Sequence, residues 1–106
     1  MILTTTPTIE GHKIQKYLGI VTSESIIGAN AFRELGAQIR DFFCGRTRGY
    51  EKVLKEAREN ALQELEEYAE QLGANAIVGI DLDYESVGES NSILMAVASG
   101  TAVVIE

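Results

Sequence analysis

The clearest alternation of apolar and polar residues begins at Ala76 and continues to Val87. Ile80, Leu82 and Tyr84 lie on one face of this segment, and Asp81, Asp83 and Glu85 lie on the other. The apolar segment that follows, from Ser92 to Ile105, carries no charge on either face. A period of two is typical of β-strands. We therefore predict strands over 76–87 and 92–105, connected by a turn at Gly88–Asn91.

Between residues 50 and 72 the apolar positions recur at steps of three and four, the spacing of an amphipathic helix. This stripe consists of Tyr50, Val53, Leu54, Ala57, Ala61, Leu65, Tyr68, Ala69 and Leu72. Charged side chains, most of them Glu, occupy the opposite face. Gly73 follows at the position where a left-handed residue commonly ends a helix. The pattern predicts one long helix.

The amino-terminal half is less regular. Residues 1–6 favour a strand, which Pro7 ends or confines to a sheet edge. Residues 13–26 are rich in β-branched and aromatic side chains and predict one long strand, in which Gly19 is suited to a β-bulge. Residues 30–43 change to helical spacing and predict a second, short helix.

Together these elements predict a single α+β domain over residues 1–106, an antiparallel sheet packed against one long helix with a short extra helix. The last strand is apolar on both faces, so both faces need a cover. One long helix covers one face. Either a second copy of the chain covers the other, or the short helix wraps it within the monomer. The residues expected at an interface between copies share one face of this strand: Met95, Val97, Val103 and Ile105.

Composition narrows the class of protein. The 106 residues carry a net charge of −7, which argues against nucleic acid or an anionic membrane surface as a partner. Residues 1–50 carry +2 and residues 51–106 carry −9, a split that favours head-to-tail self-association or, alternatively, reflects a solvated acidic helix face. A single Cys forbids an internal disulfide, and no apolar run reaches the roughly 18 residues of a membrane span. We expect a cytoplasmic protein.

Asp81, Asp83 and Glu85 are the candidate metal ligands. Alternate residues on a strand lie about 7 Å apart on one face, so the three carboxylates form an acidic ladder. Hard divalent cations prefer such oxygen ligands, although their sites usually draw ligands from a curved loop. The alternative is a solvent-facing strand that pairs with nearby Lys or Arg side chains.

The chain offers little for catalysis. It has one Cys, Cys44, and one His, His12, so no zinc-type spacing of Cys and His exists within one chain. Equivalent copies of either side chain could still converge in a closed ring. His12 lies in a Gly-His-Lys turn with no nucleophile motif nearby, and we therefore expect that the protein is not an enzyme.

The turn Gly45–Gly49 is a candidate anion site. Arg46 and Arg48 lie within it, just before the long helix, where main-chain N–H groups also favour an anion. The segment lacks the P-loop pattern, so the signal for nucleotide is weak. The simpler interpretation is a structural turn between two helices.

Several strings of residues are similar to the YbjQ family of small bacterial and archaeal proteins. They are Tyr17–Val21, Gly45-Arg46 followed by Tyr50, Leu72–Gly79 (LGANAIVG), Asp83-Tyr84, Met95 and Gly100–Val103. The resemblance covers almost the whole chain, and LGANAIVG together with the later GTAVV is its most specific part.

The resemblance implies a dodecin-like subunit with a curved antiparallel sheet, assembled into a ring that is typically a pentamer. It also implies binding of a heavy-metal ion, without a ligand set that could be carried over to named residues. Cys44 stands where the family commonly has Gly, so it is a poor candidate for a shared ligand. The expected function is therefore a homo-oligomeric metal-binding protein. The alternatives are a small-anion or metabolite site at subunit junctions through Arg46 and Arg48, and a structural ring that binds another protein.

Overall fold

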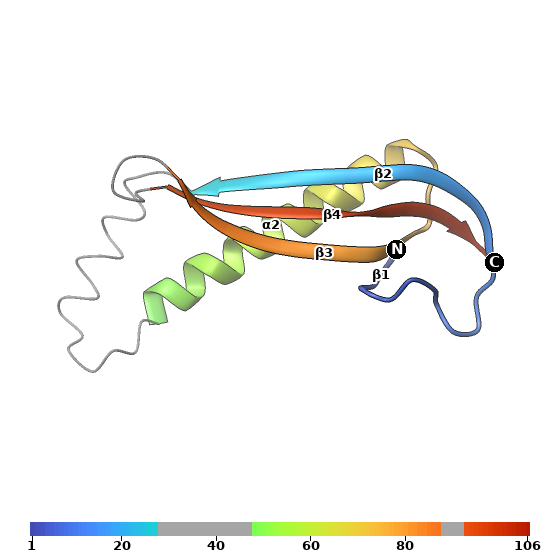
Figure 1. Cartoon of the computed structure of the whole chain (residues 1–106), viewed down its shortest axis with the longest axis horizontal. Coiled ribbons are helices and arrows are strands. Elements are labelled where there is room, and N and C mark those ends of the chain that lie inside the picture. The colour runs from blue at the N-terminus through green and yellow to red at the C-terminus, as the bar shows by residue number, and fades with distance from the viewer. Residues whose placement is uncertain (28–47, 88–92) are drawn as a thin grey trace.

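The computed structural model describes residues 1–27, 48–87 and 93–106. Its elements in chain order are β1 (Ile2–Leu3), β2 (Ile14–Ile27), α2 (Arg48–Gln71), β3 (Ala76–Val87) and β4 (Ile93–Ile105) (Figure 1). The long helix and the three long strands confirm the prediction to within two residues at each end. The predicted short helix at 30–43 and the turn at 88–91 lie outside the described residues.

The four strands form one sheet in the order β1-β3-β4-β2. β4 runs antiparallel to both β2 and β3, whereas β1 pairs in parallel with the start of β3. The sheet is therefore mixed, and the prediction of a wholly antiparallel sheet is wrong at β1. A strand of two residues is too short to show an alternating pattern. Its direction depends on the path of the residues that follow it, and no local pattern reveals that path.

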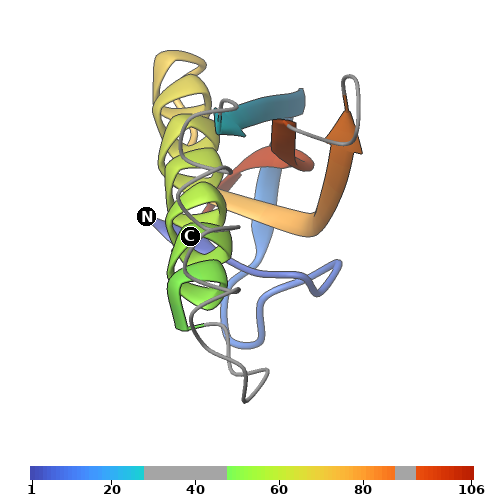
Figure 2. The ribbon, with the colours of Figure 1, turned by 90° about the vertical axis from the view of Figure 1, so that its left-hand side faces the viewer.

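Helix α2 lies across one face of the sheet, mainly over β2 and β4 (Figure 2). The apolar stripe of the helix and the inward face of the sheet form one core, whose buried members are Val21, Ala57, Ala61, Leu65, Ala69, Ile77, Ala96, Ala98 and Ala102. Most of these side chains are alanines, which allows the helix to approach the strands closely. Among the described residues, no helix is long and apolar enough to cross a membrane.

The connection from α2 to β3 is fixed by two devices. Gly73 has a φ of 90°, and the N–H groups of Gly73 and Ala74 donate to the carbonyls of Glu70 and Ala69. This is a Schellman ending, as the glycine predicted. Directly afterwards, the side chain of Asn75 accepts a hydrogen bond from the Ile105 N–H at 2.7 Å and donates one to the Ile105 carbonyl at 3.0 Å. The first residue of β3 is thereby aligned with the end of β4.

Three register shifts interrupt the strand pairing, and the first lies between Ile14 and Lys16 at the start of β2. The pairing of β2 with β4 shifts between Tyr17 and Gly19, where Gly19 has a φ of 127°, and this confirms the predicted bulge. The pairing of β3 with β4 shifts between Val78 and Asp81. In that gap the N–H groups of Gly79 and Ile80 donate to the carbonyls of Thr6 and Thr4 instead. The amino-terminal segment therefore extends the pairing that β1 begins along the outer edge of β3.

The face of the sheet that α2 does not cover will be called the open face. The amino-terminal segment crosses only one end of it, where Ile9 and Ile14 pack on a second apolar cluster of Ala76, Val78, Val103 and Ile105. Val103 and Ile105 had been expected at an interface between copies, but they are already buried within the subunit. The sequence did not reveal this because the covering residues lie about ninety positions away. Met95 and Val97 remain half-buried on the open face.

Candidate functional site

The acidic ladder lies on the open face, as the alternation along β3 predicted. Pairing with β4 places Asp81 opposite Ser99, Asp83 opposite Val97 and Glu85 opposite Met95. The same β4 residues pair on their other side with Thr22, Glu24 and Ile26 of β2. On the open face, the carboxylates of β3 therefore stand beside the apolar residues Val97 and Met95 of β4.

Asp81 and Asp83 are the two members of the ladder that interact most strongly. A hydrogen bond between their side chains raises the pKa of Asp83, and the negative charge of Asp81, slight burial and the charge of Glu85 act in the same direction. A hydrogen bond between two carboxyl groups requires a proton on one of them. The site therefore concentrates negative charge that a proton, or a cation in its place, would stabilise.

One subunit does not complete a metal site in the part of the chain that the structure describes. No group of three or more His, Cys, Asp or Glu side chains is arranged there to hold an ion. Asp81, Asp83 and Glu85 follow one another along one face of β3, so each is about 7 Å from the next along the strand. Cys44 lies outside the described residues.

His12 is held at the far end of the sheet. Its Nδ1 lies 2.7 Å from the main-chain oxygen of Glu106, and the neighbouring Gln15 amide donates to the Glu106 carboxylate at 3.2 Å. When Nδ1 carries the proton and donates it to that oxygen, the lone pair of Nε2 is left available. His12 is exposed and lies several residues along the sheet from Asp81, so the two cannot share one ion within a subunit. Sequence reasoning missed the contact because its partners are 94 positions apart.

The side chains of the predicted anion site lie outside the described residues. Arg46 lies outside the described residues, and for Arg48, the first residue of α2, the structure describes only the main chain. An anion site at this turn stays a prediction.

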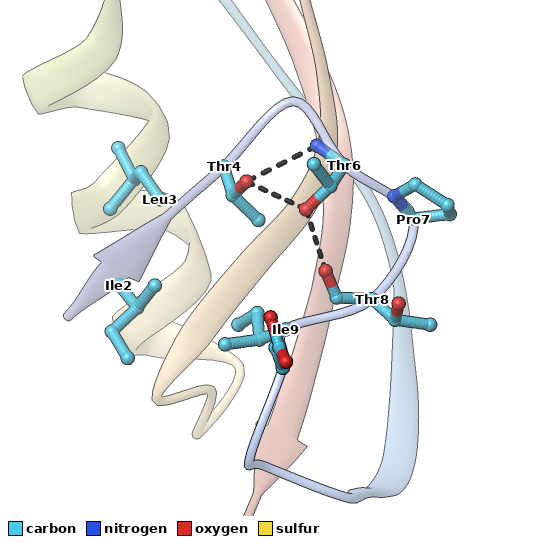
Figure 3. A pocket seen from close by; sticks show the side chains of 8 residues that line it. Ile2, Leu3, Thr4, Thr6, Pro7, Thr8 and Ile9 are labelled. Carbon is cyan, nitrogen blue, oxygen red and sulfur yellow. Dashed lines mark hydrogen bonds between the residues drawn. The ribbon is translucent and has the colours of Figure 1, made fainter.

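A shallow hollow of about 740 Å³ lies along the amino-terminal segment (Figure 3). Its lining includes Thr4, Thr6 and Thr8, and their polar groups bond mainly to one another. The hydroxyls of Thr4 and Thr6 are 2.8 Å apart, and the Thr6 hydroxyl donates to the Thr8 carbonyl at 2.6 Å. These bonds stabilise the turn that carries the chain from β1 over the edge of the sheet. The hollow therefore results from the course of the main chain at this turn.

A second hollow, of about 330 Å³, lies between the outer edge of β2 and α2. Its lining combines Thr22, Ser23, Glu24 and Ile26 of the strand with Glu64 and Tyr68 of the helix. The Tyr68 hydroxyl donates to Glu64 Oε1 at 2.7 Å. This hydrogen bond is the main cause of a raised pKa for Tyr68. The aromatic ring of Tyr68 is thus fixed beside the β2 edge.

The open face also exposes apolar side chains that a soluble monomer seldom leaves in a group. Tyr17, Ile20 and Ile26 of β2 are 68%, 79% and 63% exposed. They stand on the same face as the half-buried Met95 and Val97 of β4. Thr22 and Glu24 separate Ile20 from Ile26 on this face, so the exposed apolar side chains lie in two groups, with Ile26 beside Met95.

Comparisons with known proteins agree with this fold. The sequence model of the YbjQ family, described as "Putative heavy-metal-binding", matches residues 1–106, which is the whole chain. Among solved structures, this one is similar to a protein of unknown function of the DUF74 family from Pediococcus pentosaceus. The two are 18% identical, the alignment covers 100% of this chain and 98% of the other, and the TM-score is 0.62. At that identity the likeness shows a shared fold alone.

Proposed function

Because the chain belongs to the YbjQ family, whose description is one of heavy-metal binding, we propose that it binds a divalent metal ion as a non-enzymatic homo-oligomer. The assembly is a ring of dodecin-like subunits in the cytoplasm, with five subunits as the expected number. Asp81 and Asp83 supply carboxylate ligands from each subunit.

The position of Asp81 and Asp83 two residues apart on one face of β3 is the observation that carries this proposal. Their hydrogen bond raises the pKa of Asp83, because two adjacent carboxylates repel each other unless a positive charge is shared between them. A divalent cation can replace the shared proton. Two carboxylates leave most of the coordination sphere of a cation unfilled, and water or a second subunit supplies the remaining ligands.

The open face supports the homo-oligomer. α2 covers one side of β4, and the amino-terminal segment covers only the end that contains Val103 and Ile105. Met95 and Val97, together with the exposed Ile20 and Ile26, still present apolar surface to water. Burial of such surface is worth roughly 25 cal/mol per Å², which favours association with another copy.

Metal titration of the full chain, purified without chelator, tests the proposal. Oxygen ligands suit Mn²⁺, and imidazole or thiolate ligands suit Zn²⁺, so both ions are used as probes. We expect saturable binding of at least one of them, and at least a tenfold weaker affinity in the double variant Asp81→Asn/Asp83→Asn. The matched control is Glu56→Gln/Glu59→Gln, which removes the same charge from the exposed face of α2 and is expected to bind normally. Absence of binding by the unmodified chain would overturn the proposal.

A second candidate function, a structural ring that binds another protein, rests on the same exposed apolar residues. It predicts that Ile20→Ser/Ile26→Ser leaves the oligomer intact and removes a co-purifying protein. If these changes dissociate the oligomer instead, the apolar residues serve self-association.

A further inference from the structure

The main chain around His12, the only histidine of the chain, is fixed from both sides. The His12 N–H donates to the Ile9 carbonyl at 3.1 Å and closes a turn in which Gly11 has a φ of 83°. The next residue, Lys13, accepts a hydrogen bond at its carbonyl from the Glu106 N–H at 3.0 Å. The start of β2 is thereby joined to the carboxyl end of β4 (Figure 1). The position of the imidazole at this end of the sheet is therefore well defined.

The orientation of the His12 imidazole is set by Glu106. Nδ1 lies 2.7 Å from the main-chain oxygen of Glu106, and a protonated Nδ1 donates its proton to that oxygen. Nε2 then keeps a lone pair, and no described residue bonds to it. Histidines that bind metal ions nearly always donate their other ring N–H to a carbonyl or carboxylate oxygen, which fixes the tautomer that can coordinate. His12 therefore already makes the hydrogen bond that is typical of a metal-binding histidine.

Glu106 supplies a second donor at the same end of the sheet. Its Oε1 accepts a hydrogen bond from the Gln15 amide at 3.2 Å, whereas its Oε2 bonds to no described residue. His12, Gln15 and Glu106 are all exposed, so an ion can reach both donors from solvent. Rotation about the side-chain bonds of Glu106 moves the carboxylate while the main chain stays in place. The carboxylate can therefore turn toward the imidazole that contacts the same residue.

We propose that His12 Nε2 and the Glu106 carboxylate together bind one divalent ion of the kind that prefers imidazole, Cu²⁺ above all, with water as the remaining ligands. This pair of side chains will be called the His12–Glu106 site. It is separate from the acidic ladder, because His12 and Asp81 cannot share one ion within a subunit. The proposal therefore goes beyond the function proposed above and does not depend on it.

The two donor sets of the subunit differ in the ions that they prefer. Carboxylate oxygens alone suit hard ions such as Mn²⁺, whereas a neutral imidazole suits Cu²⁺ and Zn²⁺. Among the divalent ions of the first transition row, Cu²⁺ binds most tightly to a given set of nitrogen and oxygen donors. A nitrogen ligand also gives bound Cu²⁺ a spectroscopic signature that carboxylates cannot give. Cu²⁺ is therefore the probe that best distinguishes the His12–Glu106 site from the acidic ladder.

Neighbouring charges leave this end of the sheet open to a cation. Glu10 and Lys13 flank Gly11 and His12 in the chain and carry opposite charges. Both are exposed, and neither forms an ion pair with a described residue. Their charges offset each other, so the carboxylate of Glu106 determines the sign of the local charge. A bound cation therefore meets negative surroundings.

Copper titration of the full chain tests the site, in a Cys44→Ser background that removes the only thiol as a competing ligand. The main variant is His12→Asn. Asparagine carries its amide nitrogen at the δ position, so it can still donate to the Glu106 oxygen, but it has no atom in place of Nε2. This variant therefore removes the ligand and keeps the hydrogen bond. Glu106→Gln removes the carboxylate, and the control Glu10→Gln removes the same charge from the neighbouring turn.

We expect saturable binding of Cu²⁺, with nitrogen coupling from one imidazole in the electron paramagnetic resonance spectrum. Loss of a residue that merely orients a metal ligand already costs about 10–100-fold in affinity, so we expect a loss of at least about tenfold in both His12→Asn and Glu106→Gln. Glu10→Gln should bind Cu²⁺ as tightly as the Cys44→Ser protein does.

Unchanged Cu²⁺ affinity in His12→Asn or in Glu106→Gln would show that the altered side chain is not a ligand, and would overturn the site. Binding that survives in His12→Asn and disappears in Asp81→Asn/Asp83→Asn would place the ion on the acidic ladder. That result supports the function proposed above and overturns the His12–Glu106 site. Absence of Cu²⁺ binding by the Cys44→Ser protein also overturns the site, and titration with Mn²⁺ then shows separately whether the ladder binds metal.

Discussion

Gly100 lies so close to Ile77 that position 100 has no room for a side chain. A Cβ at position 100 would be 2.7 Å from Ile77 Cγ2, 3.1 Å from Ile80 Cγ1 and 3.2 Å from the Val78 carbonyl oxygen. The glycine lies on β4 beside the β3 bulge between Val78 and Asp81. The close approach of the strands at this bulge therefore depends on the missing side chain.

We predict that Gly100→Ala lowers the free energy of unfolding by about 1–3 kcal/mol, the usual cost of overpacking a tight core. Ile77 is fully buried and the Val78 oxygen belongs to the main chain, so neither can move away cheaply. Urea unfolding measures the change, with Ser99→Ala, on the open face, as the control. A Gly100→Ala protein as stable as the unmodified one would show that the strands are not this close.

Asn75 gives a second prediction. Its side chain makes two hydrogen bonds with the main chain of Ile105, and Asn75→Ala removes both. Each is worth about 0.5–1.5 kcal/mol, so we expect a loss of about 1–3 kcal/mol in unfolding free energy. Asn75→Asp keeps the acceptor for the Ile105 N–H and loses the donor. Its unfolding free energy should therefore lie between those of the unmodified protein and Asn75→Ala. Equal stability of all three proteins would contradict a role in aligning β3 with β4.

Ser23 is the buried polar residue that ties β2 to the helix. Its hydroxyl donates to the Ala61 carbonyl at 2.5 Å. We expect Ser23→Ala to cost only about 1 kcal/mol, because the Ala61 carbonyl remains in the hydrogen-bonded helix and is not left without a partner. Thr22→Ala, at the exposed neighbouring position, should change stability by less than about 0.5 kcal/mol. Chemical unfolding of both variants under the same conditions makes the comparison.

The acidic ladder predicts a specific pH dependence. The pKa of Asp83 is raised above its ordinary value of 3.8 mainly because its protonated carboxyl donates a hydrogen bond to the Asp81 carboxylate, so the folded state binds this proton more tightly than the unfolded state. Stability from this group is then fully present below about pH 3.8 and is lost as pH rises through the folded pKa. The loss of unfolding free energy over this pH range should be smaller in the Asp81→Asn variant than in the control variant Glu59→Gln. The unfolding free energies of both variants, measured from pH 3.5 to 6, make the comparison. If the two free energies change with pH in the same way, Asp81 and Asp83 do not share a proton.

Much of the fold could be predicted because its patterns are local. The apolar stripe that begins at Tyr50 and the alternation from Ile80 to Glu85 each identify an element within a few residues. Gly73 and Gly19 marked a helix end and a bulge because only a few residue types adopt a positive φ readily. The face that carries the acidic ladder followed directly from the period of two.

What the sequence did not predict depends on contacts between distant residues. The parallel pairing of Ile2 and Leu3 with Ala76 and Ile77 has no local signal, since a two-residue strand has no measurable period. The cover that Ile9 provides for Val103 also has no local signal, because the two residues lie about ninety positions apart in the chain. The hydrogen bond between Asp81 and Asp83 depends on side-chain orientation, which spacing alone does not determine.

Native mass spectrometry of the full chain, purified without chelator or affinity tag, tests most directly whether the protein is a homo-oligomer that holds metal ions. We predict a single discrete multiple of the 11.5 kDa chain. After addition of Mn²⁺ or Zn²⁺, this species should carry metal in a fixed whole-number ratio to its subunits. A monomer, or an oligomer that takes up neither ion, would contradict the claim.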